Sequence, residues 1–127
     1  MRFHHVRIDV ADLDRALDFY VRILGMTEVV RYVSDERTTL HLGSDGAMPG
    51  IELWCEPLAG PVVVNSSHLA FEVADTDTAY ADACASGADG IVAPFSKGRD
   101  RIAFLRDPDG HPIELLSWTS PVPQCHS

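Results

Sequence analysis

Two histidines and two glutamates stand at matched positions of an internal repeat. Residues 68–75 (HLAFEVAD) repeat residues 5–12 (HVRIDVAD), and residues 113–115 repeat the IEL of residues 51–53. The matched donors are His5 and Glu52 in the first copy and His68 and Glu114 in the second. Imidazole nitrogens and carboxylate oxygens are common ligands of divalent transition metals in proteins. The repeat therefore predicts a metal site built from two similar halves.

The residues around the first pair of donors predict a βαβββ unit. Residues 3–10 alternate in the manner of a strand, Asp12 is typical of a helix N-cap, and Gly25 is typical of the residue that ends a helix. Turn residues then separate three short strands. These strands are expected near 27–33, 37–43 and 50–56.

The second copy predicts the same order of elements, and hence an α+β fold. Its first strand is expected at 67–74, its helix near 76–86, and its other strands near 90–94, 101–106 and 112–118. A chain of 127 residues has the length of a single domain. We therefore expect a single domain at 1–119, made of modules 1–56 and 67–119 with a linker at 57–66, and a disordered tail at 120–127.

Strand alternation places the donors on the face away from the core. Val6, Ile8 and Val10 are expected to pack against the helix, which leaves His5 on the opposite face. Each glutamate lies between two apolar residues and should likewise point away from them. If the modules pair by pseudo-twofold symmetry, all four donors converge inside a curved sheet. An ionised carboxylate there is costly unless it is paired or coordinated.

The composition argues against several classes of partner. A formal net charge of −9 disfavours nucleic acid, because phosphate contacts need clustered Lys and Arg. No stretch is long and apolar enough to span a membrane, and no apolar leader segment is visible. The three cysteines form no Cys-x-x-Cys pair. We expect a soluble, cytoplasmic protein with no nucleic-acid or membrane partner.

One local stretch departs from this acidic character. Four of the ten basic residues lie close together, at Lys97, Arg99, Arg101 and Arg106. This patch could bind a small anionic substrate, and an ordinary solvated loop is an equally good interpretation.

Several motifs resemble the vicinal oxygen chelate superfamily, which includes glyoxalase I, methylmalonyl-CoA epimerase, fosfomycin-resistance enzymes, extradiol dioxygenases and bleomycin-binding proteins. The motifs are the spacing from His5 to Asp12, the helix end FYxxILG at 19–25, and DPDGHPIEL at 107–115. The resemblance covers nearly the whole chain. It implies that the two βαβββ modules form a curved mixed-sheet cup around a metal, commonly in a homodimer.

The resemblance also implies a ligand set. Bacterial glyoxalase I uses His, Glu, His and Glu, and this chain matches all four with His5, Glu52, His68 and Glu114. Epimerases usually carry Gln at the second position, so the complete set favours a metal-dependent lyase or isomerase of glyoxalase I type. A methylmalonyl-CoA-type epimerase, an Fe(II) dioxygenase and a non-catalytic drug-binding or resistance protein of the same fold remain alternatives.

Such a site would hold one divalent ion, with Ni, Co and Zn ahead of Mn and Fe. The ion would act as a Lewis acid on a carbonyl, and a glutamate would move a proton between adjacent carbons. By the resemblance, Glu114 is the first choice for this base and Glu52 is the second.

The substrate is expected to be a small molecule, anionic or a thiol adduct. The glyoxalase pattern often has an Arg that holds a glutathione carboxylate at the position where this chain has Asp9. Arg7 lies on the same strand face, and the two side chains could simply pair. Other substrate-binding candidates are Trp54, for which core packing is an equally good interpretation, and Glu72 in the second copy.

Two further histidines lie near these candidates. His41 could face the cup as an additional acid or base, although a structural strand histidine is the favoured interpretation. His4 should point away from His5, because neighbours in a strand alternate between faces.

Overall fold

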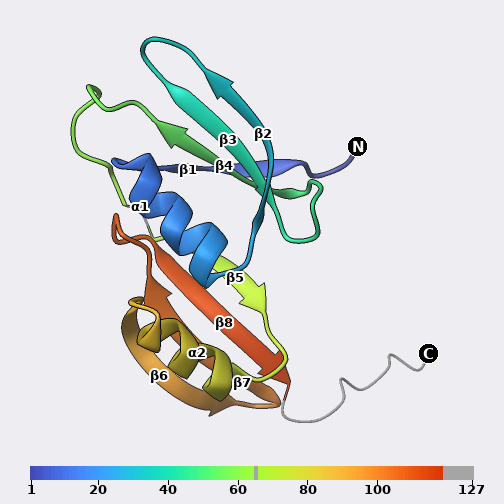
Figure 1. Ribbon diagram of the computed structural model, residues 1–127. Helices are drawn as coiled ribbons and strands as arrows, with labels where there is room; N and C mark the ends of the chain where they lie inside the picture. Colours follow the sequence, from blue (N-terminus) through green and yellow to red (C-terminus); the bar gives the residue numbers. More distant parts are fainter. Residues whose placement is uncertain (65, 119–127) are drawn as a thin grey trace. The chain divides into compact units, whose positions relative to one another are not determined.

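The computed structural model describes residues 1–64 and 66–118, and it contains two compact units, Met1–Val64 and Asn65–Ser127 (Figure 1). Each unit has the order βαβββ, which confirms the predicted α+β fold of tandem modules. The tail predicted at 120–127 lies outside the described residues. The assignment of both modules to a single domain, with a linker at 57–66, stays a prediction.

The N-terminal module begins with a strand and a two-part helix. Its elements are β1 (His5–Asp9), α1 (Leu13–Leu17), η1 (Asp18–Ile23), β2 (Thr27–Val33), β3 (Thr38–Gly43) and β4 (Gly50–Cys55). The C-terminal module repeats this order with one regular helix. Its elements are β5 (Leu69–Glu72), α2 (Thr76–Ala85), β6 (Asp89–Lys97), β7 (Asp100–Arg106) and β8 (Pro112–Trp118).

The two sheets have the same topology. Their strand orders are β1-β4-β3-β2 and β5-β8-β7-β6, with the first pair parallel and the other pairs antiparallel. In β4, Ile51 and Leu53 are buried and Glu52 lies between them on the other face. In β8, Glu114 lies between the same two residue types. The predicted orientation of both glutamates away from the core is therefore confirmed.

The helices begin and end where capping residues predict. The side chain of Asp12 accepts a hydrogen bond from the backbone N–H of Arg15, and Asp75 caps α2 in the same way. Gly25 has a φ of +78°, the left-handed conformation that favours glycine at a helix end. In the C-terminal module, α2 packs on β6, β7 and β8 (Figure 1).

The second half of the first helix is a π-helix, which the apolar spacing did not predict. The backbone N–H of Leu24 donates to the carbonyl of Phe19, five residues back. Phe19 and its neighbour Tyr20 are both buried. A wider turn lets two adjacent aromatic side chains reach the same core, whereas regular α-helical spacing separates neighbours around the axis.

Two sequence-based expectations differ from the observed strands. Val10 is buried as expected, whereas Val6 remains 38% exposed, so its predicted packing against the helix is wrong. The physical reason is that β1 lies at the edge of its sheet, where β4 is the one strand among the described residues that pairs with it. β6 also runs past Pro94, where the prediction ended, because β6 is an edge strand whose pairing with β7 shifts register between Val92 and Phe95.

None of the helices within residues 1–64 and 66–118 has the length and hydrophobicity that a membrane span requires.

Gly50 marks a close approach between strands that carry site residues. It pairs with His5 in β1 and with Gly43 in β3. A Cβ at this position would overlap the backbone carbonyl oxygen of Leu42, which cannot swing aside as a side chain can. We expect Gly50→Ala to lower the free energy of unfolding by about 1–3 kcal/mol, measured by urea unfolding.

The control is Ser44→Ala, an exposed position in the same turn. It should change the free energy of unfolding by less than about 0.5 kcal/mol. Equal unfolding midpoints for the two variants would contradict the close approach at Gly50.

Candidate metal and substrate site

The N-terminal module brings His5 and Glu52 together. β1 runs parallel to β4 with Arg7 opposite Glu52, which puts His5 and the glutamate on the same face of neighbouring strands. Nε2 of His5 lies 3.6 Å from Oε2 of Glu52. The Glu52 side chain is only 15% exposed, so its carboxylate is largely removed from water.

The C-terminal module contains the equivalent pair. Nε2 of His68 lies 3.0 Å from Oε1 of Glu114, whose side chain is 18% exposed. His68 directly precedes β5, and β5 pairs in parallel with β8. The sequence repeat is thus also a structural repeat, in which each module holds one histidine against one glutamate.

His41 is a third donor in the N-terminal module, although a structural role was the favoured interpretation from sequence. β3 places it directly opposite Glu52, and its Nε2 lies 3.0 Å from the same Oε2 that His5 approaches. Ligand atoms of His5, His41 and Glu52 all lie within 4.8 Å of one another. The signal that could have found it is the hairpin register, since pairing Gly43 with Gly50 brings His41 opposite Glu52.

The prediction that His4 points away from His5 is wrong. Nδ1 of His4 lies 2.8 Å from Nδ1 of His5, and its ring centroid is 5.4 Å from that of His41. The reason is that β1 begins at His5, so the alternation of strand side chains does not apply to His4.

The donors of the N-terminal module suit a divalent transition metal. Two ligand atoms bound at about 2.1 Å and at right angles are about 3 Å apart. The distances from Oε2 of Glu52 to the two imidazoles, 3.0 and 3.6 Å, are close to this value. A carboxylate so little exposed needs compensation, which a cation together with the imidazoles would provide. Imidazole and carboxylate ligands are compatible with Ni, Co and Zn.

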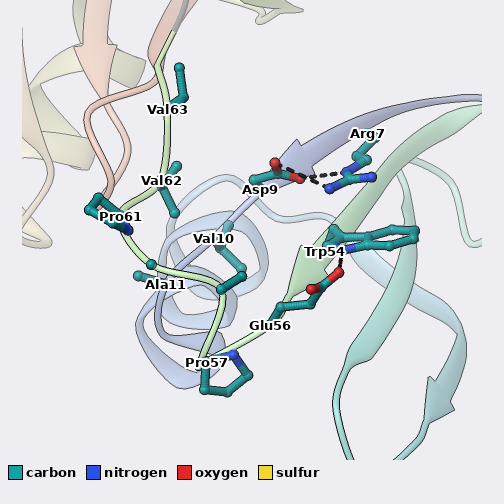
Figure 2. Close-up of a pocket in the computed structure, with 12 residues that line it drawn as sticks. Arg7, Asp9, Val10, Ala11, Trp54, Glu56, Pro57, Pro61, Val62 and Val63 are labelled. Atoms are coloured by element: carbon teal, nitrogen blue, oxygen red, sulfur yellow. Dashed lines mark hydrogen bonds and ion pairs between the residues drawn. The ribbon is translucent and has the colours of Figure 1, made fainter.

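A cavity of about 190 Å³ lies two residues further along the same strands (Figure 2). Arg7 and Asp9 of β1 and Trp54 of β4 line it, together with Glu56, Pro57 and residues 59–63. Nε of Arg7 donates to Oδ1 of Asp9 at 2.6 Å, and Nη2 donates to Oδ2 at 3.3 Å. The hydrogen bond to Asp9 raises the pKa of Arg7 above its ordinary value. The two side chains therefore pair, as the sequence suggested.

Trp54 forms part of the wall of this cavity. Its Nε1–H donates to Oε1 of Glu56 at 2.5 Å, which Figure 2 shows beside the Arg7–Asp9 pair. The guanidinium carbons of Arg7 and Arg37 lie 3.8 and 4.2 Å from the centroid of its ring. The cavity thus presents an indole surrounded by cations and anions, each of which has a partner of opposite charge.

The remaining substrate-binding candidates lie in the C-terminal module. Arg101 in β7 donates from Nε and Nη2 to both carboxylate oxygens of Asp77, each at 2.9 Å. This hydrogen-bonded pair raises the pKa of Arg101 and lowers that of Asp77. Arg101 therefore ties β7 to α2. Lys97 and Arg99 are exposed where β6 meets β7, and Glu72 is exposed at the end of β5.

Comparison with protein families gives one match over almost the whole chain. Residues 2–115 match the Glyoxalase/Bleomycin resistance protein/Dioxygenase superfamily. This match agrees with the resemblance carried by the motifs.

Several lactoylglutathione lyases are similar to this chain. The chain is 32% identical to a probable lactoylglutathione lyase of Vibrio cholerae, over 91% of this chain and 89% of the relative. It is 28% identical to the lactoylglutathione lyase of Schizosaccharomyces pombe, over 98% of this chain and 50% of the relative. The chain thus spans about half the length of the yeast protein.

Among solved structures, the trypanothione-dependent glyoxalase I of Leishmania major is similar, with a TM-score of 0.79 and 30% identity. The similarity covers 91% of this chain and 86% of that one.

Proposed function

Because the chain belongs to the glyoxalase/bleomycin resistance protein/dioxygenase superfamily, we propose that it is a metal-dependent lyase or isomerase of glyoxalase I type. The observation that carries this proposal is the presence of one His–Glu pair in each module. In the proposal, His5, Glu52, His68 and Glu114 supply ligands to one divalent ion. Similarity to lactoylglutathione lyases supports the same reaction class.

The reaction we propose moves a proton between two adjacent carbons of a small substrate. A bound divalent ion would supply Lewis-acid polarisation of the substrate carbonyl. Glu114 removes the proton from the carbon next to that carbonyl and returns it to the neighbouring carbon. The contact with Nε2 of His68 orients the carboxylate of Glu114. The low exposure of the Glu114 side chain limits the access of water to this carboxylate. Glu52 is the second choice, because two imidazoles already approach its carboxylate.

The substrate class we propose is a hemithioacetal, formed from a thiol and a 2-oxoaldehyde. The thiol part would lie in the cavity of about 190 Å³ beside Trp54. Arg7 is the cation that lines this cavity and could bind a carboxylate, but it already donates two hydrogen bonds to Asp9. A glutathione carboxylate would have to compete with Asp9, so a thiol without a carboxylate at this end should react as well as glutathione or better.

Asp9→Asn tests this substrate assignment. The substitution removes the charge that pairs with Arg7 while keeping a side chain of the same shape. We expect it to lower KM for the glutathione hemithioacetal by up to about fivefold, since exposed ion pairs contribute little more than this. KM for the hemithioacetal of a neutral thiol should stay unchanged. A higher KM for the glutathione adduct would show that Asp9 itself helps to bind it.

The direct experiment is a substrate screen with the full chain reconstituted with Ni, Co or Zn. We expect conversion of a hemithioacetal to the corresponding hydroxyacyl thioester, and loss of this turnover on chelation. Epimerisation of an acyl-CoA without hemithioacetal turnover would favour the epimerase alternative. Metal binding without turnover of either substrate would favour the binding protein. The superfamily also leads us to propose a homodimer, which sedimentation at equilibrium can check.

A further inference from the structure

We infer that His41 is a further ligand of the proposed ion, supplied by the N-terminal module, and that His5, His41 and Glu52 still bind the ion when His68 and Glu114 are replaced. The inference rests on the proposed metal dependence. It adds a donor that the matched His-Glu-His-Glu set does not contain.

The two imidazoles of His5 and His41 approach the same carboxylate oxygen. Nε2 of His41 and Nε2 of His5 both approach Oε2 of Glu52, at 3.0 and 3.6 Å. The two rings are stacked, with centroids 5.0 Å apart and planes inclined by 30°. Because both rings direct Nε2 toward Oε2 of Glu52, three donor atoms lie around one small volume. Two imidazoles and one carboxylate are a common ligand set for divalent iron, and imidazole also binds nickel and zinc.

The two modules differ at the position opposite the glutamate. In the C-terminal module, the residue opposite Glu114 is Phe104, which occupies the place that His41 has opposite Glu52. The ring of His68 packs edge-on against Phe104, with centroids 5.6 Å apart. Because both sheets have the same topology, the fold accepts an apolar ring at this position. The sheet therefore does not need an imidazole at position 41 in order to form.

His41 lies in a largely buried environment. Its side chain is 13% exposed, so its imidazole is mostly removed from water. Nδ1 of His4 lies within hydrogen-bonding distance, 2.8 Å, of Nδ1 of His5. The other ring nitrogen of His5, Nε2, faces Glu52. A hydrogen bond on one ring nitrogen selects the nitrogen that binds metal. His4 is thus a positioning residue for the same cluster.

The competing explanation is that His41 only donates a hydrogen bond that orients Glu52. Two substitutions separate these roles. His41→Phe makes the N-terminal module resemble the C-terminal one at this position. His41→Gln keeps a side chain that can donate to Glu52 but removes the imidazole nitrogen. A structural role would be rescued by Gln, whereas a ligand role would be lost in both variants.

The experiment is a titration of the untagged full chain with Co(II), followed by visible absorption. We expect His41→Phe and His41→Gln each to weaken Co(II) binding by at least about tenfold and to change the absorption spectrum. We also expect the double variant His68→Ala/Glu114→Gln to bind about one Co(II) per chain, and to lose it when His41→Phe is added. His111→Gln, in the turn before β8, is the control and should behave as the parent chain.

Two results would overturn the inference. One is an unchanged affinity and spectrum in both His41 variants, and the other is a double variant that binds no Co(II). In either case the parent chain would still bind Co(II), so the proposed four-ligand site would survive. If the parent chain itself binds no Co(II), the inference and the proposed function fail together. Circular dichroism of each variant verifies that it is folded.

Discussion

Glu114→Gln is expected to lower kcat for the hemithioacetal by about 10²–10⁴-fold, which is the usual contribution of a positioned general base. The amide has nearly the same shape as the carboxylate, but it cannot accept a proton. Because Glu114 is also a proposed ligand, kcat is measured at a metal concentration that saturates the variant. The residual rate then reports the loss of the base and not the loss of the ion.

The matched control is Glu36→Gln, the same change at an exposed position between β2 and β3. It should retain the kcat of the parent chain. If Glu114→Gln keeps its kcat to within a few fold at saturating metal, Glu114 is not the base. Glu52→Gln would then be expected to show the large loss instead.

His5→Ala is expected to weaken the binding of Ni or Co by more than about 100-fold. Loss of a residue that only supports a ligand typically costs 10–100-fold, and loss of a ligand costs more. The His5 side chain is one-third exposed, so its removal should leave the thermal midpoint of the metal-free chain almost unchanged. Calorimetric titration of the metal-free chain measures the affinity.

His111→Ala removes a histidine from the turn before β8 and provides the comparison. It should bind the ion as tightly as the parent chain. If His5→Ala binds Ni or Co as tightly as His111→Ala does, His5 is not a metal ligand. It would also leave the repeat of His and Glu without a metal-binding role.

The arrangement of Glu52 and Glu114 could be predicted from the sequence because it depends on local alternation. Each lies between two apolar residues in a central strand, and burial of those neighbours orients the carboxylate toward the other face. The partners His5 and His68 followed from their matched positions in the repeat. These inferences needed no knowledge of how far apart the strands lie along the chain.

The role of His41 could not be predicted in the same way. Its contact with Glu52 depends on the register between β3 and β4, which the turn at residues 44–49 sets. A shift of one residue would have sent the imidazole to the opposite face. His4 lies outside the strand because β1 starts at His5, two residues later than the alternating pattern suggests. For His41 the register between strands decided the outcome, and for His4 the residue at which the strand begins.

Metal content and turnover of the purified chain together show whether its activity depends on a divalent ion. After removal of metal and titration with Ni, Co, Zn, Mn and Fe in turn, we expect about one divalent ion per chain. Addition of a chelator should abolish hemithioacetal turnover, and addition of the ion should restore it. If the chain binds none of these ions at saturating concentration, or turns over the hemithioacetal equally well without them, the proposed metal-dependent reaction is wrong.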